Sequence, residues 1–527
     1  MPRVAIIGGG HNGLTAAAYL ARAGVEVTVL ERLPHVGGAA VSAQAFDGLD
    51  ARLSRYSYLV SLLPAQIIAD LGLDVRLARR RYSSYTPEPG TDRGLLIDAG
   101  DEVATRASFA AIGAAGDADG FARFYDRTTR LAAALFPTLT GPLPTREAAR
   151  AAAGSASAWS EVADAPIADA IERAVAHDLV RGVIATDALI GTFARLDDPG
   201  LEQNRCLLYH VIGGGTGDWD VPIGGMGQVS GELEIAARQA GATVLTGVTV
   251  TRLTPDGEVT WEERIGGLTT DGEGLPTGTE LTAQFDLVLS AVAPNVLGRL
   301  LGDEGGAAPR PEGAQVKVNM LLSRLPRLRD GVSAEAAFGG TFHINEGYAQ
   351  LDRAYAEAAA GRIPDPLPCE IYCHSLTDPS ILGASLRDSG AQTLTVFGLH
   401  VPDRLLTPDT NERMRVELER AVIASLDSVL AEPIEPLLLE GAHGPAIETK
   451  TTLDIEEALA MPGGNIFHGP LSWPWLEHEA TSIAESWGVE TAHPRILMAG
   501  SGARRGGAVS GIGGHNAAHA ALELLRP

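Results

Sequence analysis

VAIIGGGHNGLTAAAYLARAGVEVTVLE, residues 4–31, is the stretch of sequence that decides the fold. Residues 4–7 form a continuous apolar run, which is typical of a buried parallel strand. The Ala- and Leu-rich segment 14–23 favours a helix that stops at Gly24, and residues 25–30 read as the next strand. The sequence therefore predicts a strand, a glycine turn, a helix and a second strand.

The turn between the first strand and the helix fits the pattern G-x-G-x-x-G. Gly8, Gly10 and Gly13 occupy the glycine positions, with Asn12 between them. In this pattern the first glycine permits a tight turn, the second lets a pyrophosphate approach the backbone, and the third allows close helix–strand packing. Glu31 ends the second strand, where a carboxylate can accept hydrogen bonds from a ribose and disfavours a 2′-phosphate. We therefore expect these residues to bind a dinucleotide.

Two more glycine-rich segments favour a flavin over a nicotinamide. Gly37 and Gly38 form a second paired-glycine turn, whose backbone amides can reach a long dinucleotide. The tail GSGARRGGAVSGIGG, residues 500–514, leads straight into an expected helix. Free N–H groups and the positive dipole at that helix end would stabilise negative charge on a reduced flavin. The alternative for the tail is a flexible loop before a packing helix.

The remainder of the chain alternates between α/β stretches and other patterns. Helical spacing dominates from about residue 107 to 198, and short β-branched and aromatic runs occupy about 302–440. We predict an α/β protein in which a Rossmann-type FAD-binding domain is interrupted by an α+β substrate domain. The predicted FAD-binding domain comprises 1–105, 215–300 and 445–527, and the substrate domain comprises 106–214 and 301–444.

Composition excludes several classes of protein. The chain of 527 residues exceeds the roughly 100–200 residues of one domain, so two or more domains are expected. A net charge of −25 repels phosphate backbones and argues against a nucleic-acid partner. Three cysteines are too few for a disulfide scaffold. Cys369 and Cys373 are four residues apart in the alternating stretch 369–373, where as a strand they would share a face; without further ligands they predict buried hydrophobes and no metal site. With no export leader or membrane span recognised, we expect a cytoplasmic protein, with peripheral membrane contact left open.

Six motifs together carry a family resemblance: GGAAVS at 37–42, SRYSYLVSLL at 54–63, ATDALIG at 185–191, GGMG at 224–227, GNIFHG at 464–469 and GSGARRGGAVSGIGGHNAAH at 500–519. From residue 4 to about residue 522 the sequence resembles the phytoene desaturase-like FAD-dependent oxidoreductases. Within them it is most similar to the subgroup of pyridine nucleotide-disulphide oxidoreductase domain-containing protein 2 and its bacterial relatives. The resemblance implies a glutathione-reductase-like or amine-oxidase-like fold and non-covalent FAD.

The resemblance also implies cofactor contacts beyond the first turn. Val250 would contact the adenine through its backbone, and the remaining expected contacts are Arg32, Ala39, Gly500, Ser501, Gly502, Gly511 and Ile512. Two departures stand out. Many amine-oxidase-like relatives have an arginine where this chain has Ala39, and glutathione-reductase-like relatives usually have an aspartate where it has Ser501 and Gly502. We therefore expect backbone-dominated flavin contacts in the last loop.

His468 is the candidate catalytic residue, because it lies in an aromatic neighbourhood and an imidazole can move a proton near neutral pH. Capping of its loop is the alternative. Arg55, Tyr56 and Tyr58 are candidates for the cavity wall. The cluster Gly213 to Gly217 is not followed by a helix, so we interpret it as a loop and not as a second dinucleotide site.

These observations predict an FAD-dependent oxidoreductase of the dehydrogenase or desaturase type. It would transfer hydride between the flavin and a carbon–carbon bond of an apolar organic molecule, with oxygen, a quinone or another electron acceptor. A flavin-dependent isomerase is one alternative, and a flavin-binding regulatory or interaction protein with little turnover is another. The sequence leaves the substrate, the acceptor and the oligomeric state open.

Overall fold

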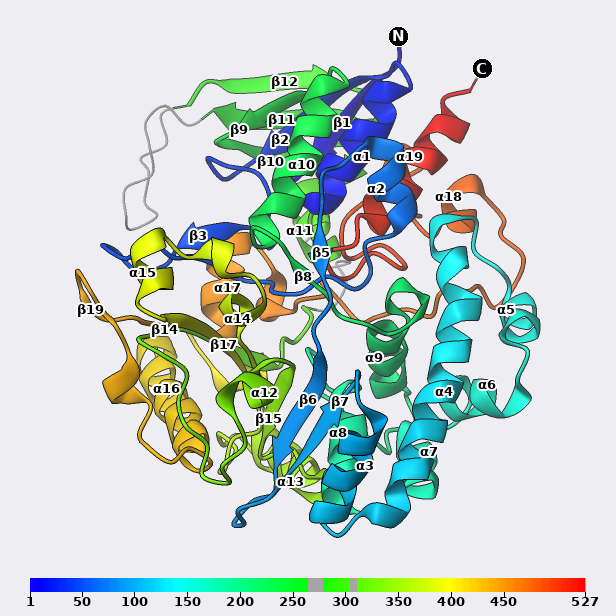
Figure 1. The fold of residues 1–527 in the computed structure, drawn as a ribbon. Helices are drawn as coiled ribbons and strands as arrows, with labels where there is room; N and C mark the ends of the chain where they lie inside the picture. The colour runs from blue at the N-terminus through cyan, green and yellow to red at the C-terminus, as the bar shows by residue number, and fades with distance from the viewer. Residues whose placement is uncertain (264–277, 304–309, 527) are drawn as a thin grey trace.

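A five-stranded parallel sheet forms the core of one half of the molecule, the upper half in Figure 1. We call it the first half, although its strands come from both ends and the middle of the chain. The computed structural model describes residues 1–263, 278–303 and 310–526. The strand order is β21-β13-β1-β2-β9, and every neighbouring pair is parallel. The strands are β1 (Arg3–Ile7), β2 (Glu26–Glu31), β9 (Thr243–Thr246), β13 (Leu287–Ser290) and β21 (Ile496–Met498).

Helix α1 (His11–Arg22) lies against this sheet and contacts two further helices. α10 (Met226–Gln239) and α19 (Ile512–Leu524) both pack on α1, so the last helix of the chain joins the first (Figure 1). Four alanines of α19 are fully buried in the same core as β1: Ala517, Ala518, Ala520 and Ala521. The predicted opening unit and closing helix are confirmed, and the closing helix is an integral part of the nucleotide-binding core.

The stretch 242–250 alternates in sequence as one strand would, but the structure forms two strands there. Gly247 has φ 72°, which L side chains rarely adopt, and the chain turns there. β9 ends before this glycine in the parallel sheet, while β10 (Val248–Leu253) pairs with β11 (Glu258–Glu263), which pairs with β12 (Glu280–Gln284). The Gly-, Asp- and Thr-rich stretch 254–283 suits a solvent-facing ribbon or loop, and its residues 264–277 lie outside the described residues.

The second half of the molecule is built on a seven-stranded sheet. Its order is β20-β14-β17-β16-β15-β6-β7, and all pairs are antiparallel except β6 with β15. Its strands are β6 (Tyr82–Pro87), β7 (Gly94–Asp98), β14 (Gln315–Leu322), β15 (Thr341–Ile344), β16 (Cys369–Tyr372), β17 (Gln392–Leu399) and β20 (Ile447–Lys450). Helix α16 (Asn411–Asp427) packs on β14 and β20.

Sheet membership corrects the predicted domain boundaries. β6 and β7 lie within 1–105 and β20 lies within 445–527, two ranges that were predicted for the FAD-binding domain. All three strands hydrogen-bond in the seven-stranded sheet instead. A short apolar run predicts a strand but not its partner, because pairing is decided by tertiary contacts.

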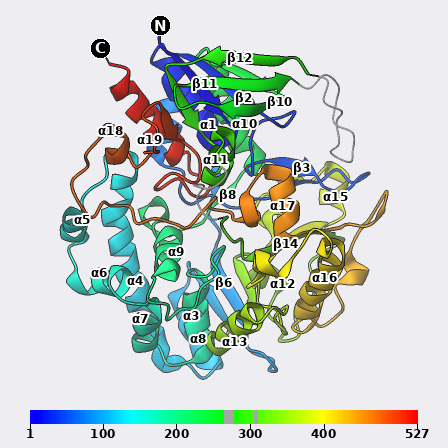
Figure 2. The same cartoon turned by 180° about the vertical axis from the view of Figure 1, so that it is seen from behind.

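A layer of helices from the predicted 106–214 region flanks the second sheet. Figures 1 and 2 show α4 to α7 at one side of this half and α16 at the other. The layer comprises α3 (Glu102–Ala111), α4 (Ala118–Leu135), α5 (Arg146–Ala153), α6 (Ala156–Ala163), α7 (Ile167–Ala174), α8 (Asp178–Thr186) and α9 (Glu202–Val211). The predicted combination of a Rossmann-type sheet with an α+β second part is therefore confirmed.

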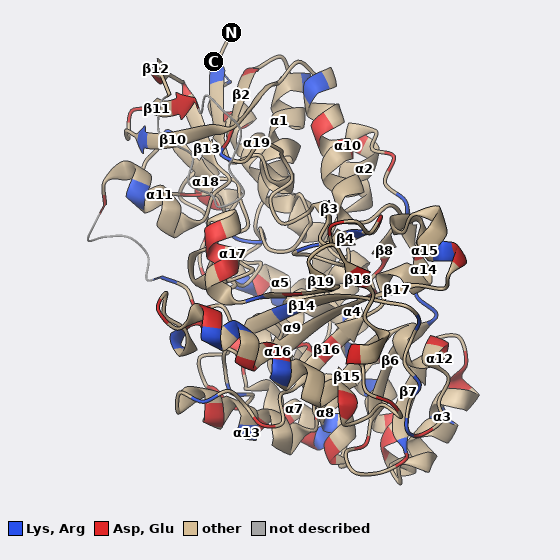
Figure 3. Cartoon of the chain, turned by 90° about the vertical axis from the view of Figure 1, so that its left-hand side faces the viewer, with Lys and Arg blue, Asp and Glu red and all other residues tan. Residues whose placement is uncertain are grey.

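The other described strands and α-helices are mostly short. They are β3 (Ser42–Gln44), β4 (Arg52–Ser54), α2 (Ala65–Leu71), β5 (Leu77–Ala78), β8 (Val221–Pro222), α11 (Pro294–Leu301), α12 (Ala334–Phe338), α13 (Tyr348–Ala359), α14 (His374–Thr377), α15 (Ala384–Asp388), β18 (Glu440–Gly441), β19 (Gly444–Pro445), α17 (Thr452–Leu459) and α18 (Ile483–Ser486). Among the described residues, no helix is both long and apolar enough to cross a membrane. Acidic and basic segments are interspersed on the side shown in Figure 3.

Candidate functional site

A cavity of about 280 Å³ begins at the predicted glycine turn and runs toward the second sheet; we call it the dinucleotide cavity. Ten of the predicted cofactor residues line it: Gly8, Gly10, Asn12, Gly13, Glu31, Arg32, Gly38, Ala39, Val250 and Ser501. They come from the ends of β1 and β2, the start of α1, the paired-glycine segment between β2 and β3, β10 and the loop after β21. The parallel sheet thus gathers distant segments around one cavity, at the carboxyl ends of its strands.

The three motif glycines have the geometry that their roles require. Gly8 has φ +101°, and a Cβ on Gly13 would lie 2.1 Å from the carbonyl oxygen of Gly8. A Cβ on Gly10 would have only the Cα atom of Gly38 nearby, at 3.9 Å. Gly13 therefore allows the helix to approach the strand, whereas Gly10 leaves its open side to the cavity.

Glu31 is held at the cavity wall by two backbone amides. It is 8% exposed, and its two carboxylate oxygens accept hydrogen bonds from Gly9 N and Leu33 N, both at 2.7 Å. A carboxylate has about four acceptor sites, so capacity remains for ribose hydroxyls. The fixed position of this side chain suits the predicted ribose contact.

The start of α1 adds polar atoms that the protein itself does not satisfy. Asn12 Nδ2 donates to Gly506 O at 3.2 Å, which ties α1 to the last loop, and Asn12 Oδ1 is buried without a partner among the described residues. His11 is also buried at the cavity wall, and burial lowers its pKa to about 4 despite the nearby Ala508 backbone. A helix N-terminus with unsatisfied buried polar atoms fits a polar ligand such as a diphosphate.

Five predicted cofactor residues do not line the dinucleotide cavity, and their roles there stay predictions. Gly37 N donates to Gly9 O at 2.9 Å, which joins the two glycine turns. A Cβ on Gly500 would lie 2.6 Å from Ala291 O, and Gly511 has φ +71°. These three glycines therefore shape the backbone around the cavity. The other two, Gly502 and Ile512, line a neighbouring cavity.

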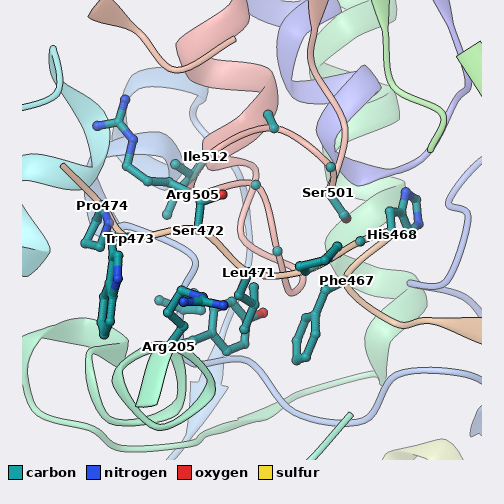
Figure 4. A pocket seen from close by; sticks show the side chains of 18 of the residues that line it. Arg205, Phe467, His468, Leu471, Ser472, Trp473, Pro474, Ser501, Arg505 and Ile512 are labelled. Atoms are coloured by element: carbon teal, nitrogen blue, oxygen red, sulfur yellow. The ribbon is translucent and has the colours of Figure 1, made fainter. Parts of the chain in front are cut away.

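That neighbouring cavity, which we call the side cavity, has a volume of about 210 Å³ and lies beside the last loop (Figure 4). Figure 4 shows Arg205 and Phe467 on one side of it, with Arg505 and Ile512 on the other. It shares Tyr209, Phe467, His468 and Ser501 with the dinucleotide cavity. The predicted aromatic neighbourhood of His468 is present, because Phe467 and Trp473 belong to this wall.

His468 lies between the two cavities, in a position to contact a ligand in either. Its Nδ1 atom is buried without a partner among the described residues. Burial, with a smaller contribution from His11, lowers the pKa of His468 to about 4. Its imidazole is therefore neutral near pH 7, so the titration on which its predicted catalytic role was based does not occur there. The role itself stays a prediction.

A third cavity, of about 630 Å³, lies between the seven-stranded sheet and helices α4 and α8; we call it the substrate-side cavity. It shares four wall residues with the dinucleotide cavity: Tyr58, Ile190, His210 and Trp219. Tyr56 and Tyr58 both line the dinucleotide cavity as predicted. Arg55 instead forms an ion pair with Glu448. The shared wall brings the second half of the molecule against the dinucleotide cavity.

The substrate-side cavity contains a group of buried ionisable residues. The Tyr372 hydroxyl donates to Glu370 Oε1, while Glu370 Oε2 has no partner among the described residues. His343 Nδ1 lies 2.8 Å from Glu346 Oε2. Burial raises the pKa of Glu370 to about 8, with His343 opposing and Glu346 adding to the rise, and burial raises the pKa of Asp187 to about 6. At neutral pH this group can exchange protons with a ligand.

Sequence reasoning missed this group and also His11 and His210. Glu370 stands in the stretch 369–373, which was interpreted only through its cysteines. An acidic residue between apolar neighbours in a predicted buried strand was the signal that could have found it. Asp187 lies in the family motif at 185–191, but nothing local signalled its pairing with Glu370 or the role of His343, because these residues meet only through the fold.

The cysteines form no redox pair. Cys206, Cys369 and Cys373 are buried free thiols, and burial raises the pKa of each. The prediction of buried hydrophobes is therefore confirmed. Among the residues that the structure describes, no cluster of metal-ligating side chains occurs.

Comparisons with known proteins agree with this geometry. The family described as NAD(P)-binding Rossmann-like domain matches residues 6–66. A Mycobacterium tuberculosis protein, named only as uncharacterized, is 58% identical over 99% of this chain and 97% of its own. Pyridine nucleotide-disulfide oxidoreductase domain-containing protein 2 of Rattus norvegicus is 30% identical over 99% of this chain and 93% of its own.

Among solved structures, cyclohexylamine oxidase from Brevibacterium oxydans superposes with a TM-score of 0.55 at 17% identity, covering all of both chains. This likeness concerns the fold. The fold and the cavity at the glycine turn define an oxidoreductase of the flavin type, with a Rossmann nucleotide-binding domain. More narrowly, the chain belongs to the family of pyridine nucleotide-disulfide oxidoreductase domain-containing protein 2. The subgroup that the motifs predicted is thereby confirmed.

Proposed function

We propose that this protein is an FAD-dependent oxidoreductase that holds FAD non-covalently in the dinucleotide cavity and oxidises or reduces an organic molecule in the substrate-side cavity. The observation that carries the proposal is the shared wall of Tyr58, Ile190, His210 and Trp219. A ligand that starts at the glycine turn can extend to this wall, and a substrate can meet it from the other side. Hydride transfer requires such direct contact.

The chain's own residues supply binding and orientation. The open side of Gly10 and the start of α1 would accept the diphosphate, and Glu31 would accept the ribose hydroxyls. The buried, unpartnered Oδ1 of Asn12 would gain a hydrogen bond from the ligand. A bound flavin supplies the hydride chemistry, while the protein excludes water from the cavity.

In one version of the proposal, the flavin exchanges hydride with a carbon–carbon bond of an apolar substrate. Oxygen, a quinone or another molecule would then be the electron acceptor. The substrate-side cavity favours a substrate that also carries a polar group, because Glu370, Asp187 and His343 line it. The isomerase alternative uses the same site but returns the flavin to its starting redox state. A flavin-binding regulatory protein would show neither reaction.

Anaerobic mixing of the yellow protein with candidate organic substrates tests the proposal. We expect at least one substrate to bleach the flavin absorbance, and a product that differs by two hydrogens in mass. A product of unchanged mass would favour isomerisation. Absence of bleaching and of turnover across polyenes, fatty acids, amines and alcohols would overturn the proposal in favour of a binding protein.

We further predict that neither NADH nor NADPH reduces this flavin at a catalytically useful rate. The cluster Gly213 to Gly217 begins with a short 3₁₀ turn, Gly213–Gly215, and leads to β8 and not directly to a helix, so it lacks the geometry of a second dinucleotide site for a nicotinamide. No cysteine pair relays electrons. In anaerobic stopped-flow mixing, flavin absorbance should persist for minutes with either nicotinamide. Full bleaching within seconds would contradict this prediction.

A further inference from the structure

We call the part of the substrate-side cavity around Thr186, Asp187, His343 and Glu370 its inner end, and its carboxyl groups are not all matched by cations. Arg79 pairs with Asp218 and Asp220, Arg81 pairs with Asp98, and His343 pairs with Glu346. The described lining then leaves Arg80, Asp187 and Glu370 outside these pairs, so two carboxylates face one cation whenever Glu370 is ionised. The Arg80 guanidinium donates hydrogen bonds to Trp219 O at 3.2 Å and to Thr341 Oγ1 at 3.1 Å.

Two buried polar atoms at this end lack partners. Glu370 is 2% exposed and its Oε2 atom makes no hydrogen bond among the described residues. Thr186, beside Asp187 at the end of α8, is also 2% exposed, with its hydroxyl unpartnered. Buried polar groups in native proteins are nearly always hydrogen-bonded to protein, water or ligand. Both atoms therefore call for a hydrogen-bond donor or acceptor that enters from the cavity.

Aromatic rings line the same cavity, and one of them contacts Glu370. Tyr58 and Tyr372 lie with ring centroids 4.1 Å apart, and Tyr372 also holds Glu370 in place through its hydroxyl. Phe121, Tyr125 and Trp219 line the same cavity. Aromatic faces beside a carboxylate attract a cation, both through the ring quadrupoles and through direct charge.

We propose that this inner end binds a protonated nitrogen, so that the substrate class is an amine whose ammonium group is held by Glu370 and Asp187 against the aromatic wall. The inference rests on the proposed function, because it names the substrate of that same site. The inference follows from the carboxylates of this chain, and it uses no property of other proteins with a similar fold. It also narrows the predicted apolar substrate to one with an apolar body and a cationic end.

Binding of a cation has a proton signature. The pKa of Glu370 is raised to about 8, so much of this carboxyl is protonated at pH 7. A bound ammonium stabilises the ionised carboxylate and lowers that pKa, so binding at pH 7 should release protons to solution. The titratable groups that face the same carboxyl are His343, Glu346, Asp187, Tyr372 and Tyr58. They are the same with and without the bound ammonium.

The test uses the yellow full-length protein with benzylammonium as the probe and benzyl alcohol as its neutral counterpart. Binding is followed by flavin difference absorbance, and proton release is measured in weakly buffered solution at pH 7. We expect benzylammonium to bind about tenfold or more tightly than benzyl alcohol and to release protons. Equal affinities, or ammonium binding without proton release, would overturn the inference.

Variants show whether the preference for benzylammonium comes from this site or from the overall negative charge of the protein. Glu370→Gln should lose most of the preference for benzylammonium and the proton release, and Asp187→Asn should weaken the preference. The matched control Glu102→Gln alters a side chain that is 78% exposed on α3 and should change neither. Melting curves and FAD content show whether each variant is folded. If Glu370→Gln does not fold, the Asp187→Asn protein provides the test instead. Unchanged preference in a folded Glu370→Gln protein would overturn the inference.

Failure of this inference is distinguishable from failure of the proposed function. A protein that contains FAD and is bleached by a neutral substrate, yet prefers benzyl alcohol, contradicts only the cationic site. A protein that lacks flavin contradicts the proposed function before any probe is added.

Discussion

Gly10→Leu should leave the protein folded and remove its FAD. A Cβ at Gly10 meets nothing closer than 3.9 Å, and its φ of −71° suits any residue, so the turn tolerates the substitution. The longer side chain, however, occupies the space through which a pyrophosphate approaches the backbone. We expect FAD content to fall by about tenfold or more, measured as the ratio of flavin to protein absorbance.

Two further glycine variants make this result specific. Gly231→Leu is the matched control, because a Cβ there also meets no atom within 4 Å, but it lies on α10 away from the cavity. Gly13→Ala should instead destabilise the fold by about 3 kcal/mol or more, because its Cβ would lie 2.1 Å from Gly8 O. A Gly10→Leu protein with wild-type FAD content would contradict the placement of the diphosphate.

Truncation before Gly500 should abolish both flavin retention and cooperative folding. The sequence predicted the loss of flavin, since the last loop and helix would donate hydrogen bonds to it. The structure adds a second cause, because the buried alanines of α19 pack on α1 in the core of the first sheet. Removal would uncover that apolar surface, at a cost of roughly 25 cal/mol for each Å² exposed.

Near-ultraviolet circular dichroism and flavin content measure the two losses separately. A chain shortened only by Arg526 and Pro527 should keep both properties, because it retains all of α19. A folded protein that lacks residues 500–527 and holds FAD at wild-type occupancy would refute the role assigned to the tail.

The parts of the site that were predictable from sequence are those encoded by local pattern. The strand, turn and helix around Gly10 are contiguous, and each glycine is dictated by backbone geometry within a few residues. Glu31 follows on the neighbouring strand in a fixed register with β1. Their positions around the dinucleotide cavity therefore follow from the first 31 residues.

The acidic group of the substrate-side cavity was not predictable in this way. Asp187 directly follows α8, His343 lies on β15 and Glu370 lies on β16, so their meeting depends on how the sheet and the helical layer pack. The assignment of β6 to the second sheet has the same origin, because its parallel partner β15 lies more than 250 residues further along the chain.

His468 shows how environment can alter the chemistry that a residue type suggests. The sequence supplied an imidazole among aromatic residues, and the structure places it between two cavities. Burial then lowers its pKa to about 4, whereas burial raises the pKa of Glu370 to about 8. The group that titrates near physiological pH is therefore the carboxyl and not the imidazole.

The central claim is that one FAD molecule is held without a covalent bond in the dinucleotide cavity. Acid precipitation of the purified yellow protein, followed by chromatography of the supernatant, tests it most directly. We predict that the colour leaves the pellet completely and that the supernatant contains FAD at about one molecule per chain. Colour that stays with the precipitated protein, or a supernatant that contains a nicotinamide dinucleotide and no flavin, would contradict the account.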